Sequence, residues 1–315
     1  MIDFFNLTDN SLNNQVFYAN GTTSWQIWQK PNNAKFINIL AIGGGGGGGA
    51  GGSNNAGAGG GGGGGSSAIS RLFINSCVLP DRLYVQVGNG GRGGIQSPVS
   101  AATSGGISYV SVQPNTSSLS VVVASGNAGA GFGGQGQNGA SPGTAGVAGA
   151  ADSGSMLSQL GFYQTISGII GQAGGPGSSI LSSITLGVSP YILPITPGMG
   201  GSGLSAGGTP DSTGNIIGGG FIPTISGGTS NPTGGTQGSN GYYGLTPNSN
   251  SSSRSPFFST GGAGGGAGGY SLIVGFGGTG GAGGYGCGGG GGGASYTTST
   301  NGGRGGDGLV IITCY

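Results

Sequence analysis

The stretch GGGGGGGAGGSNNAGAGGGGGGG at residues 43–65 decides the fold, because 17 of its 23 residues are glycine. Ordering a glycine costs more conformational entropy than ordering any other residue, so one ordered strand of this composition would not persist alone. A flexible tether is the simplest alternative. The stretch is uncharged and directly follows the strand-like run 35–42, which favours a packed structure. We therefore predict two rods in the polyproline II conformation, broken at residues 53–56, with Asn54 and Asn55 exposed at the tip.

Rods of this kind form no internal hydrogen bonds, so each rod has to pair its backbone groups with those of neighbouring rods. Only glycine lets the rods approach closely enough. The chain supplies further runs at 261–269 and 277–293, with looser ones at 88–94 and 126–149. The glycines expected to pack in rods include Gly43, Gly46, Gly49, Gly59, Gly62, Gly65, Gly264, Gly268, Gly288 and Gly291.

The composition favours a folded chain that does not bind nucleic acid or enter a membrane. Only 4% of the 315 residues are charged and the net charge is +1, while 86 residues are glycine and 34% are hydrophobic. Disordered chains usually combine high net charge with few apolar residues, which is the opposite pattern. The scattered Lys and Arg residues leave no basic footprint for nucleic acid. No run of 18 apolar residues is present, so we expect no membrane insertion.

The first residues, MIDFFN, have neither the basic nor the apolar region of a secretory signal, so we expect synthesis in a cytoplasm. Three cysteines occur without the spacing of metal ligands. We expect Cys77 and Cys314, in strand-like runs, to be buried free thiols, and Cys287 to fill a gap in a glycine run. No metal site is expected.

Strand signals surround the glycine runs. We expect strands at 16–18, 23–29, 35–42, 67–78, 83–87, 107–112, 119–124 and 308–314, with a hairpin joining 23–29 to 35–42 and another joining 107–112 to 119–124. A weak helical period occurs only at 155–170. Alternating strand directions place the turns 30–34, 79–82 and 113–118 at one end, together with the C-terminus. The predicted fold is an all-β antiparallel sandwich with little or no α-helix, and polyglycine II helices project from its opposite pole.

The catalytic groups of most enzymes are missing. The chain contains no His and no Glu, which excludes Ser-His-Asp and Cys-His arrangements and His-rich zinc sites. Asp152 and Asp211 are the only plausible carboxylate pair for glycoside hydrolysis, and nothing else supports that role. We therefore expect no enzymatic activity and no cofactor.

Changes in amino-acid composition along the chain divide it into four regions. These are an N-terminal lead for attachment at 1–22, a glycine-rich β domain at 23–135, an insert rich in Gly, Pro, Ser and Asn at 136–260, and a closing part of the β domain at 261–315. An ordered insert of this length is rare unless it has a function. Its aromatic rings could contact another molecule, or they could fill a glycine-rich lattice that lacks other bulky side chains. The candidate contact residues are Asn54, Asn55, Phe162, Tyr163, Tyr191, Phe221, Tyr242, Tyr243, Phe257 and Phe258.

A Trp-containing strand and a Pro turn precede an apolar strand that runs into GGGGGGGAGG, followed by VGNGGRGG at 87–94 and a closing GGRGGDGLVII at 302–312. This order of motifs resembles the glycine-rich domain of bacteriophage and other viral tail-fibre proteins. The chain is also similar to the polyglycine-sandwich tip adhesins of tailed phages. The resemblance covers about residues 23–135 and 260–315, and we recognise no counterpart for 136–260.

This resemblance implies a virion protein whose β-rich base attaches to the particle and whose loops bind a host-cell receptor, either a glycan or an outer-membrane protein. It also implies contacts with other virion or fibre proteins and a homo-oligomer, with the trimer as the form typical of fibres. Two other functions compete with this one. The chain could be a purely structural virion component, such as a capsid or fibre decoration protein, or a flat polyglycine bundle could bind ice, which the long apolar strands and the irregular insert disfavour.

Overall fold

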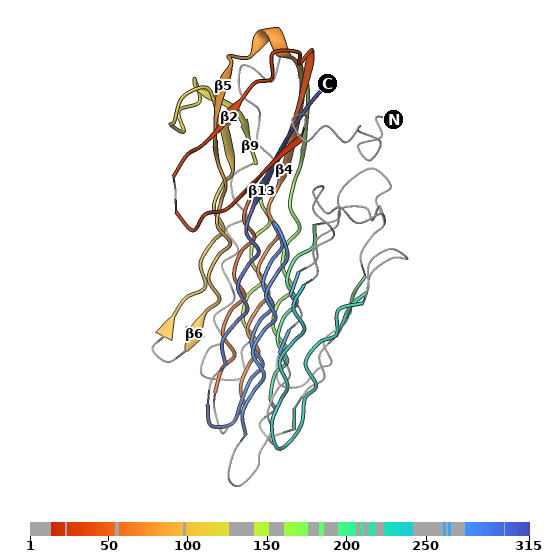
Figure 1. Cartoon of the computed structure of the whole chain (residues 1–315). Coiled ribbons are helices and arrows are strands. Elements are labelled where there is room, and N and C mark those ends of the chain that lie inside the picture. Colours follow the sequence, from red (N-terminus) through yellow and green to blue (C-terminus); the bar gives the residue numbers. More distant parts are fainter. Residues whose placement is uncertain are drawn as a thin grey trace.

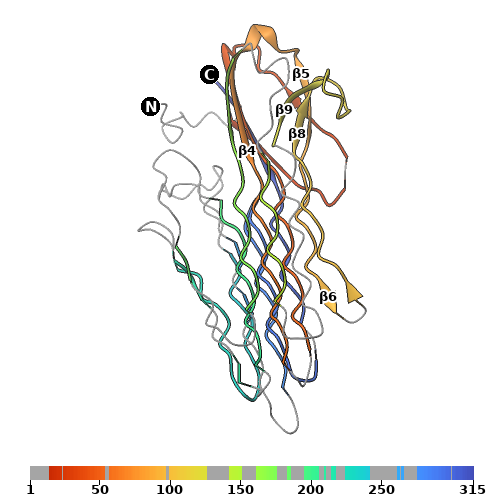
Figure 2. The same cartoon turned by 180° about the vertical axis from the view of Figure 1, so that it is seen from behind.

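A computed structural model gives the architecture of the chain (Figure 1). It describes residues 14–22, 24–53, 57–96, 99–125, 142–150, 161–175, 183–185, 195–205, 209–210, 214–217, 224–241, 261–262, 264–265, 275–298 and 300–315. Two antiparallel sheets lie at one end, and the glycine segments extend from them as long, roughly parallel traces toward the other end (Figures 1 and 2).

The first sheet has five strands in the order β1-β13-β3-β4-β10. Its strands are β1 (Asn14–Tyr18), β13 (Leu309–Cys314), β3 (Phe36–Ile42), β4 (Ile69–Asn75) and β10 (Phe162–Ile166). The second sheet has four strands in the order β2-β5-β8-β9. They are β2 (Gln26–Gln29), β5 (Arg82–Gln86), β8 (Tyr109–Ser111) and β9 (Val121–Ala124). All pairs in both sheets are antiparallel, which confirms the predicted sandwich.

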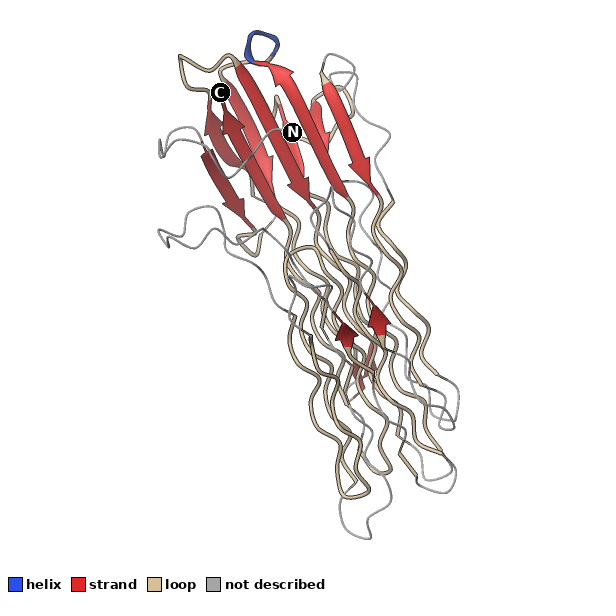
Figure 3. Cartoon of the chain, turned by 90° about the vertical axis from the view of Figure 1, so that its right-hand side faces the viewer, coloured by secondary structure: helices blue, strands red, loops and turns tan. Residues whose placement is uncertain are grey.

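Shorter elements complete the described part. A single 3-10 turn, η1 (Ser76–Val78), follows β4. β6 (Ile95–Gln96) pairs in antiparallel fashion with β7 (Val99–Ser100), beyond the glycine segment that follows β5. β11 (Ile184–Thr185) pairs in parallel with β12 (Ile216–Ile217). Figure 3 shows the large strands gathered at one end and loop structure along most of the projection. The absence of α-helix among the described residues agrees with the predicted fold class.

The hydrophobic core lies between the two sheets. Alternate residues of β3 and β4, such as Ile39 and Leu72, face Leu83 and Val110 of the second sheet, and all four side chains are fully buried. This alternation follows from the two-residue period of a strand. A second, smaller cluster covers part of the outer face of the five-stranded sheet, where Ile195 packs with Ile42, Leu309 and Cys287. The glycine region therefore contributes side chains that bury this outer face.

The predicted hairpin between residues 23–29 and 35–42 is wrong. β2 pairs with β5 and β3 pairs with β4 and β13, so the turn at 30–34 crosses from one sheet to the other. Both strands are apolar enough to lie in a core, and a sequence signal for a short turn does not distinguish pairing within a sheet from crossing between sheets. The hairpin between 107–112 and 119–124 is confirmed as the pair β8 and β9.

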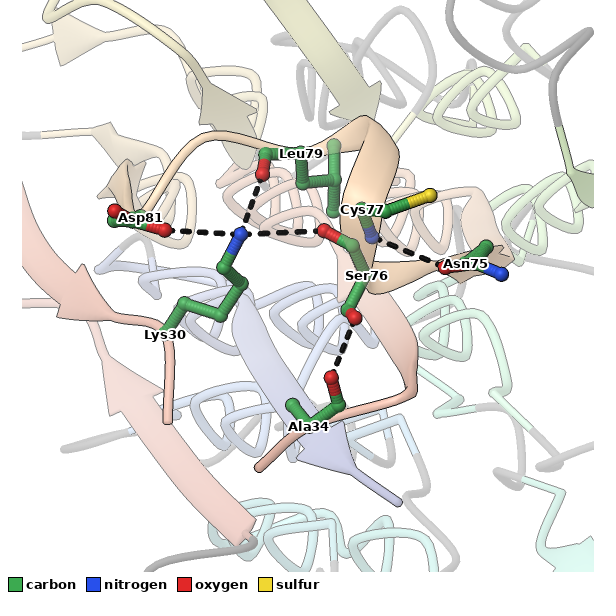
Figure 4. A network of polar contacts seen from close by, with 7 residues as sticks. All are labelled: Lys30, Ala34, Asn75, Ser76, Cys77, Leu79 and Asp81. Carbon is green, nitrogen blue, oxygen red and sulfur yellow. Dashed lines mark hydrogen bonds and ion pairs between the residues drawn. The ribbon is translucent and has the colours of Figure 1, made fainter. Parts of the chain in front are cut away.

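Lys30 fixes this crossing turn (Figure 4). Its ammonium group donates to the Leu79 carbonyl at 2.7 Å and to the Ser76 carbonyl at 3.2 Å, and it pairs with Asp81 at 3.0 Å. Ser76 in turn donates its hydroxyl to the Ala34 carbonyl at 2.5 Å. These bonds tie the end of β2 to the connection between β4 and β5. The two sheets are thus joined at the end opposite the glycine region.

Two further expectations need correction. Residues 162–166 form strand β10, the edge strand beside β4, although 155–170 shows a weak helical period. Pairing with β4 decides the conformation because local helical preference is weaker than tertiary pairing. Cys77 is exposed, because it lies in η1 at the turn rather than within a strand. Cys314 is a buried free thiol, as expected, and Cys287 is buried within its glycine run.

Candidate functional site

The glycine segments form a bundle, which we define as the described parts of residues 43–66, 88–106, 142–150, 168–175, 195–205, 224–241, 261–265 and 275–308. The central segment, 43–52, donates backbone hydrogen bonds in three directions with a period of three. Gly44 and Gly47 donate to segment 102–106, Gly45, Gly48 and Gly51 donate to segment 300–306, and Gly46, Gly49 and Gly52 donate to segment 59–65. The N···O distances lie between 2.7 and 3.1 Å.

The same segment accepts hydrogen bonds from two further neighbours. Gly91 and Gly94 donate to it from one side, and Gly289, Gly292 and Ser295 donate from another. Segment 43–52 therefore has five hydrogen-bonded neighbours, which satisfies backbone groups that would otherwise be buried without partners. A period of three is what the polyproline II helix gives, so this network supports the prediction of polyglycine II rods.

Carbonyl groups of neighbouring segments occupy the space that side chains would need. A Cβ atom added at Gly45 or Gly48 would lie closer than 3.0 Å to the carbonyl oxygen of Cys287 or Gly290. At Gly44 and Gly47 it would meet the carbonyl oxygens of Asn89 and Arg92 in the same way. The run needs glycine at these positions because the neighbouring backbones are too close for any side chain.

The chain reverses direction between the two halves of the opening glycine stretch. Gly52 pairs with Gly59, Gly49 with Gly62, and Gly46 with Gly65, so the two segments run antiparallel. Ser53 lies at the end farthest from the sheets, in an isolated bridge with Ser295. Asn54 and Asn55, the predicted tip, lie outside the described residues.

The number of glycines in each three-residue repeat follows the position of a segment in the bundle. The segments 43–52 and 59–65 are almost entirely glycine and buried. Segment 300–308 carries one larger residue in three. These residues, Asn301, Arg304 and Asp307, are more exposed than most of the glycines between them. In segments 142–150 and 168–175, about one residue in three is a glycine that faces the interior of the bundle. Gly143, Gly146 and Gly149 are examples, and each donates a backbone hydrogen bond to segment 60–66. The composition of each repeat thus indicates how many sides of a segment are covered.

Two sides of the bundle differ in chemistry. Segments 88–94, 102–106 and 300–308 all contact segment 43–52, and they present Asn89, Arg92, Thr103, Arg304 and Asp307. Segments 142–150 and 168–175 contact segment 60–66, on the other side of the central pair. Their large exposed residues are apolar: Val147, Ile169 and Ile170 are 54%, 52% and 61% exposed. One side of the bundle is therefore polar and the other is apolar.

Of the predicted receptor contacts, the structure describes only Phe162 and Tyr163. Both lie on edge strand β10, at the sheet end of the molecule, so they do not belong to the far tip of the bundle. Phe162 is 63% exposed, whereas Tyr163 packs against the core between the sheets. The other eight residues lie outside the described part: Asn54, Asn55, Tyr191, Phe221, Tyr242, Tyr243, Phe257 and Phe258.

Nine of the ten predicted rod glycines are described, and Gly268 lies outside. Added Cβ atoms at Gly43, Gly65, Gly264, Gly288 and Gly291 would come closer than 3.0 Å to a neighbour. Gly46, Gly49, Gly59 and Gly62 all take part in the backbone network described above. Arg92, Arg304 and Asp307 were not among the predicted site residues. Their signal in the sequence is the three-residue repeat GGR and GGD, which places a charged side chain at the same point of each turn.

The described residues contain no group of three or more His, Cys, Asp or Glu side chains that could hold a metal ion. Asp152 and Asp211 lie outside the described part, so their proximity is not tested. Within the same part of the chain, no helix is long and apolar enough to cross a membrane.

Fold and site together define an all-β protein in which a sandwich carries a hydrogen-bonded glycine bundle. A family model described as a glycine-rich domain matches residues 19–315, and the chain belongs to this family. The match runs through residues 136–260, whose sequence motifs alone indicate no family counterpart. No curated protein matches the chain.

Proposed function

We propose that the chain is a viral fibre protein that binds a host-cell surface without catalysis. The observation that carries this proposal is the separation of the molecule into a sandwich at one end and a bundle of glycine segments that projects away from it (Figures 1 and 3). Binding residues are commonly found on loops that a rigid scaffold positions. The hydrogen-bonded bundle is such a scaffold, because its backbone groups are held by several neighbours at once.

The described part of the far end carries side chains suited to binding a sugar or a protein loop. Phe276 is 51% exposed, and it forms bridges with Gly234 and Thr298. Thr297 and Thr298 are exposed in the turn that follows segment 287–295. An exposed ring beside hydroxyl groups can stack on a sugar while the hydroxyl groups form hydrogen bonds with it.

Adsorption experiments test the proposal. Purified full-length chain, labelled with a fluorophore, should bind saturably to cells of the virus's host and should block adsorption of the virus. Phe276→Ser should weaken both effects, whereas Leu119→Ser, at an 82% exposed position in the sandwich turn, should change neither. Absence of saturable binding by the unmodified chain would overturn the proposal.

A purely structural virion component is the second candidate. The exposed apolar side chains Val147, Ile169 and Ile170 favour it, because an apolar face of this kind suits contact with another subunit. A density map of the particle separates the two functions. Burial of the whole bundle among other subunits would favour the structural role, and a bundle that projects freely would favour host binding.

A further inference from the structure

We propose that Arg92 and Arg304 form a binding site for the acid group, phosphate or carboxylate, of an anionic cell-surface glycan. This inference names the ligand class for the surface binding proposed above and rests on that function. The site lies on the polar side of the bundle, between segments 88–94 and 300–308. Its position is separate from the far tip.

Backbone hydrogen bonds place the two arginines side by side. Gly302 donates to the Gly94 carbonyl at 3.0 Å and Gly305 donates to the Gly91 carbonyl at 2.9 Å, so the segments run antiparallel with Arg92 and Arg304 at the same level. Because each segment repeats every three residues, the side chains at 89 and 92 form one column, and those at 301, 304 and 307 form the next. Glycines fill the positions that face neighbouring segments, which leaves these columns for the surface.

Asp307 holds the arrangement together. Its Oδ1 accepts the Gly90 N–H at 2.7 Å and pairs with an amino group of Arg304 at 2.5 Å. The carboxylate therefore reaches across from segment 300–308 to segment 88–94 and holds the Arg304 side chain by an ion pair. Arg304 keeps further N–H donors, because a guanidinium group has five.

Arg92 lacks a counterion among the described residues. Its side chain is exposed, and the ion pairs within the described part of the chain are Lys30 with Asp81 and Arg304 with Asp307. The two arginines and the Asp307 carboxylate together carry a local net charge of about +1. On a protein with 4% charged residues, this is a distinct feature.

An acid group fits this arrangement in charge and in shape. Guanidinium groups bind phosphate and carboxylate through pairs of parallel N–H···O bonds, and these charge-assisted bonds are stronger than neutral ones. The anion would replace the missing counterion of Arg92 and use the free donors of Arg304. The exposed Asn301 amide and Thr103 hydroxyl offer groups that can contact sugar hydroxyls. An acidic glycan therefore suits the site better than an isolated anion.

Binding of the full chain to paired polysaccharides tests the site. The probes are polygalacturonate with its methyl ester, and phosphomannan with dephosphorylated mannan, so that each acid has a neutral counterpart. The variants are Arg92→Gln, Arg304→Gln and Arg92→Lys. Arg82→Gln is the control, because it removes the same charge from an exposed position in the sandwich. Melting curves establish that each variant is folded.

We expect the full chain to prefer the acidic member of at least one pair, and the pair that responds identifies carboxylate or phosphate. Arg92→Gln and Arg304→Gln should each lower the affinity for the acidic polysaccharide about tenfold or more. The affinity of Arg92→Lys should lie between those of the Gln variants and the unmodified chain. The affinity of Arg82→Gln should stay within about twofold of the unmodified chain. Equal binding of acidic and neutral members, or an equal loss in Arg82→Gln, would overturn the site. If cell adsorption persists after that result, the proposed function stands; if acidic glycans bind but host cells do not, the proposed function fails instead.

Discussion

At the scale of single residues, the glycine bundle depends on the absence of side chains at defined positions. Gly64 shows this clearly, because a Cβ atom there would lie closer than 3.0 Å to the Gly46 carbonyl oxygen and the Gly47 carbonyl. Backbone cannot move aside as a flexible side chain can. By contrast, Val147 belongs to a segment at the edge of the bundle and is 54% exposed.

We therefore expect Gly64→Ala to lower the free energy of unfolding by about 1–3 kcal/mol or more, because it overpacks a close contact between backbones. Val147→Ala should change it by less than about 0.5 kcal/mol, as surface substitutions usually do. Urea denaturation of both variants measures the difference. Equal midpoints would show that the segments are not packed against one another.

The three cysteines should differ in reactivity. Cys77 is exposed, while Cys287 and Cys314 are buried, and burial raises the pKa of the Cys314 thiol to about 11. The thiolate is the reactive form, so at pH 8 a thiol reagent should modify one cysteine of the native chain and all three after denaturation. Mass spectrometry counts the modified residues. Rapid modification of Cys287 in the native chain would contradict the packing of segment 287–295.

At the scale of elements, serine side chains connect the sheets to the bundle. Ser108 is fully buried, and its hydroxyl donates to the Ile42 carbonyl at 2.7 Å and accepts the Gly88 N–H at 3.0 Å. Ser125 accepts the N–H of Ser108 at 2.9 Å. These bonds satisfy the backbone at the point where β3 and β5 pass into glycine segments.

Ser108→Ala should cost about 1–3 kcal/mol of stability, because it leaves the Gly88 N–H and the Ile42 carbonyl without this partner. Ser117→Ala, in the exposed turn between β8 and β9, is the control and should cost much less. Thermal unfolding compares them. A similar small loss in both variants would mean that water replaces the Ser108 hydroxyl and that the junction is open to solvent.

The positions of most strands were predictable from the sequence, whereas the pairing partners of the strands were only partly predictable. The alternating apolar residues of β5 predicted a strand because period-two burial leaves a clear local pattern, and the continuous apolar run of β13 predicted a strand that is buried on both faces. The separation of β2 and β3 into different sheets was not predictable from the turn at 30–34. It depends on Lys30 and on the partners β5 and β13, which are distant in the sequence.

At the scale of the whole molecule, the glycine runs indicated a second structure beyond the sandwich. Antiparallel return of segment 59–65 along 43–52 was predicted, because the break at 53–56 separates two runs of similar length. The five neighbours of segment 43–52 were not predicted, because identical glycines carry no signal for which segments meet. The charged pair of segments 88–94 and 300–308 was missed for the same reason, although its repeats are visible in the sequence.

The central claim is that the glycine runs form an ordered, hydrogen-bonded bundle. Amide hydrogen exchange tests it most directly, because an amide in a stable hydrogen bond exchanges only when the structure opens. Peptides covering residues 43–52 and 287–293 should be protected to the same degree as strand β3. Exchange of these glycine amides at the rate of an unfolded chain, while β3 stays protected, would contradict the bundle and restore the flexible tether.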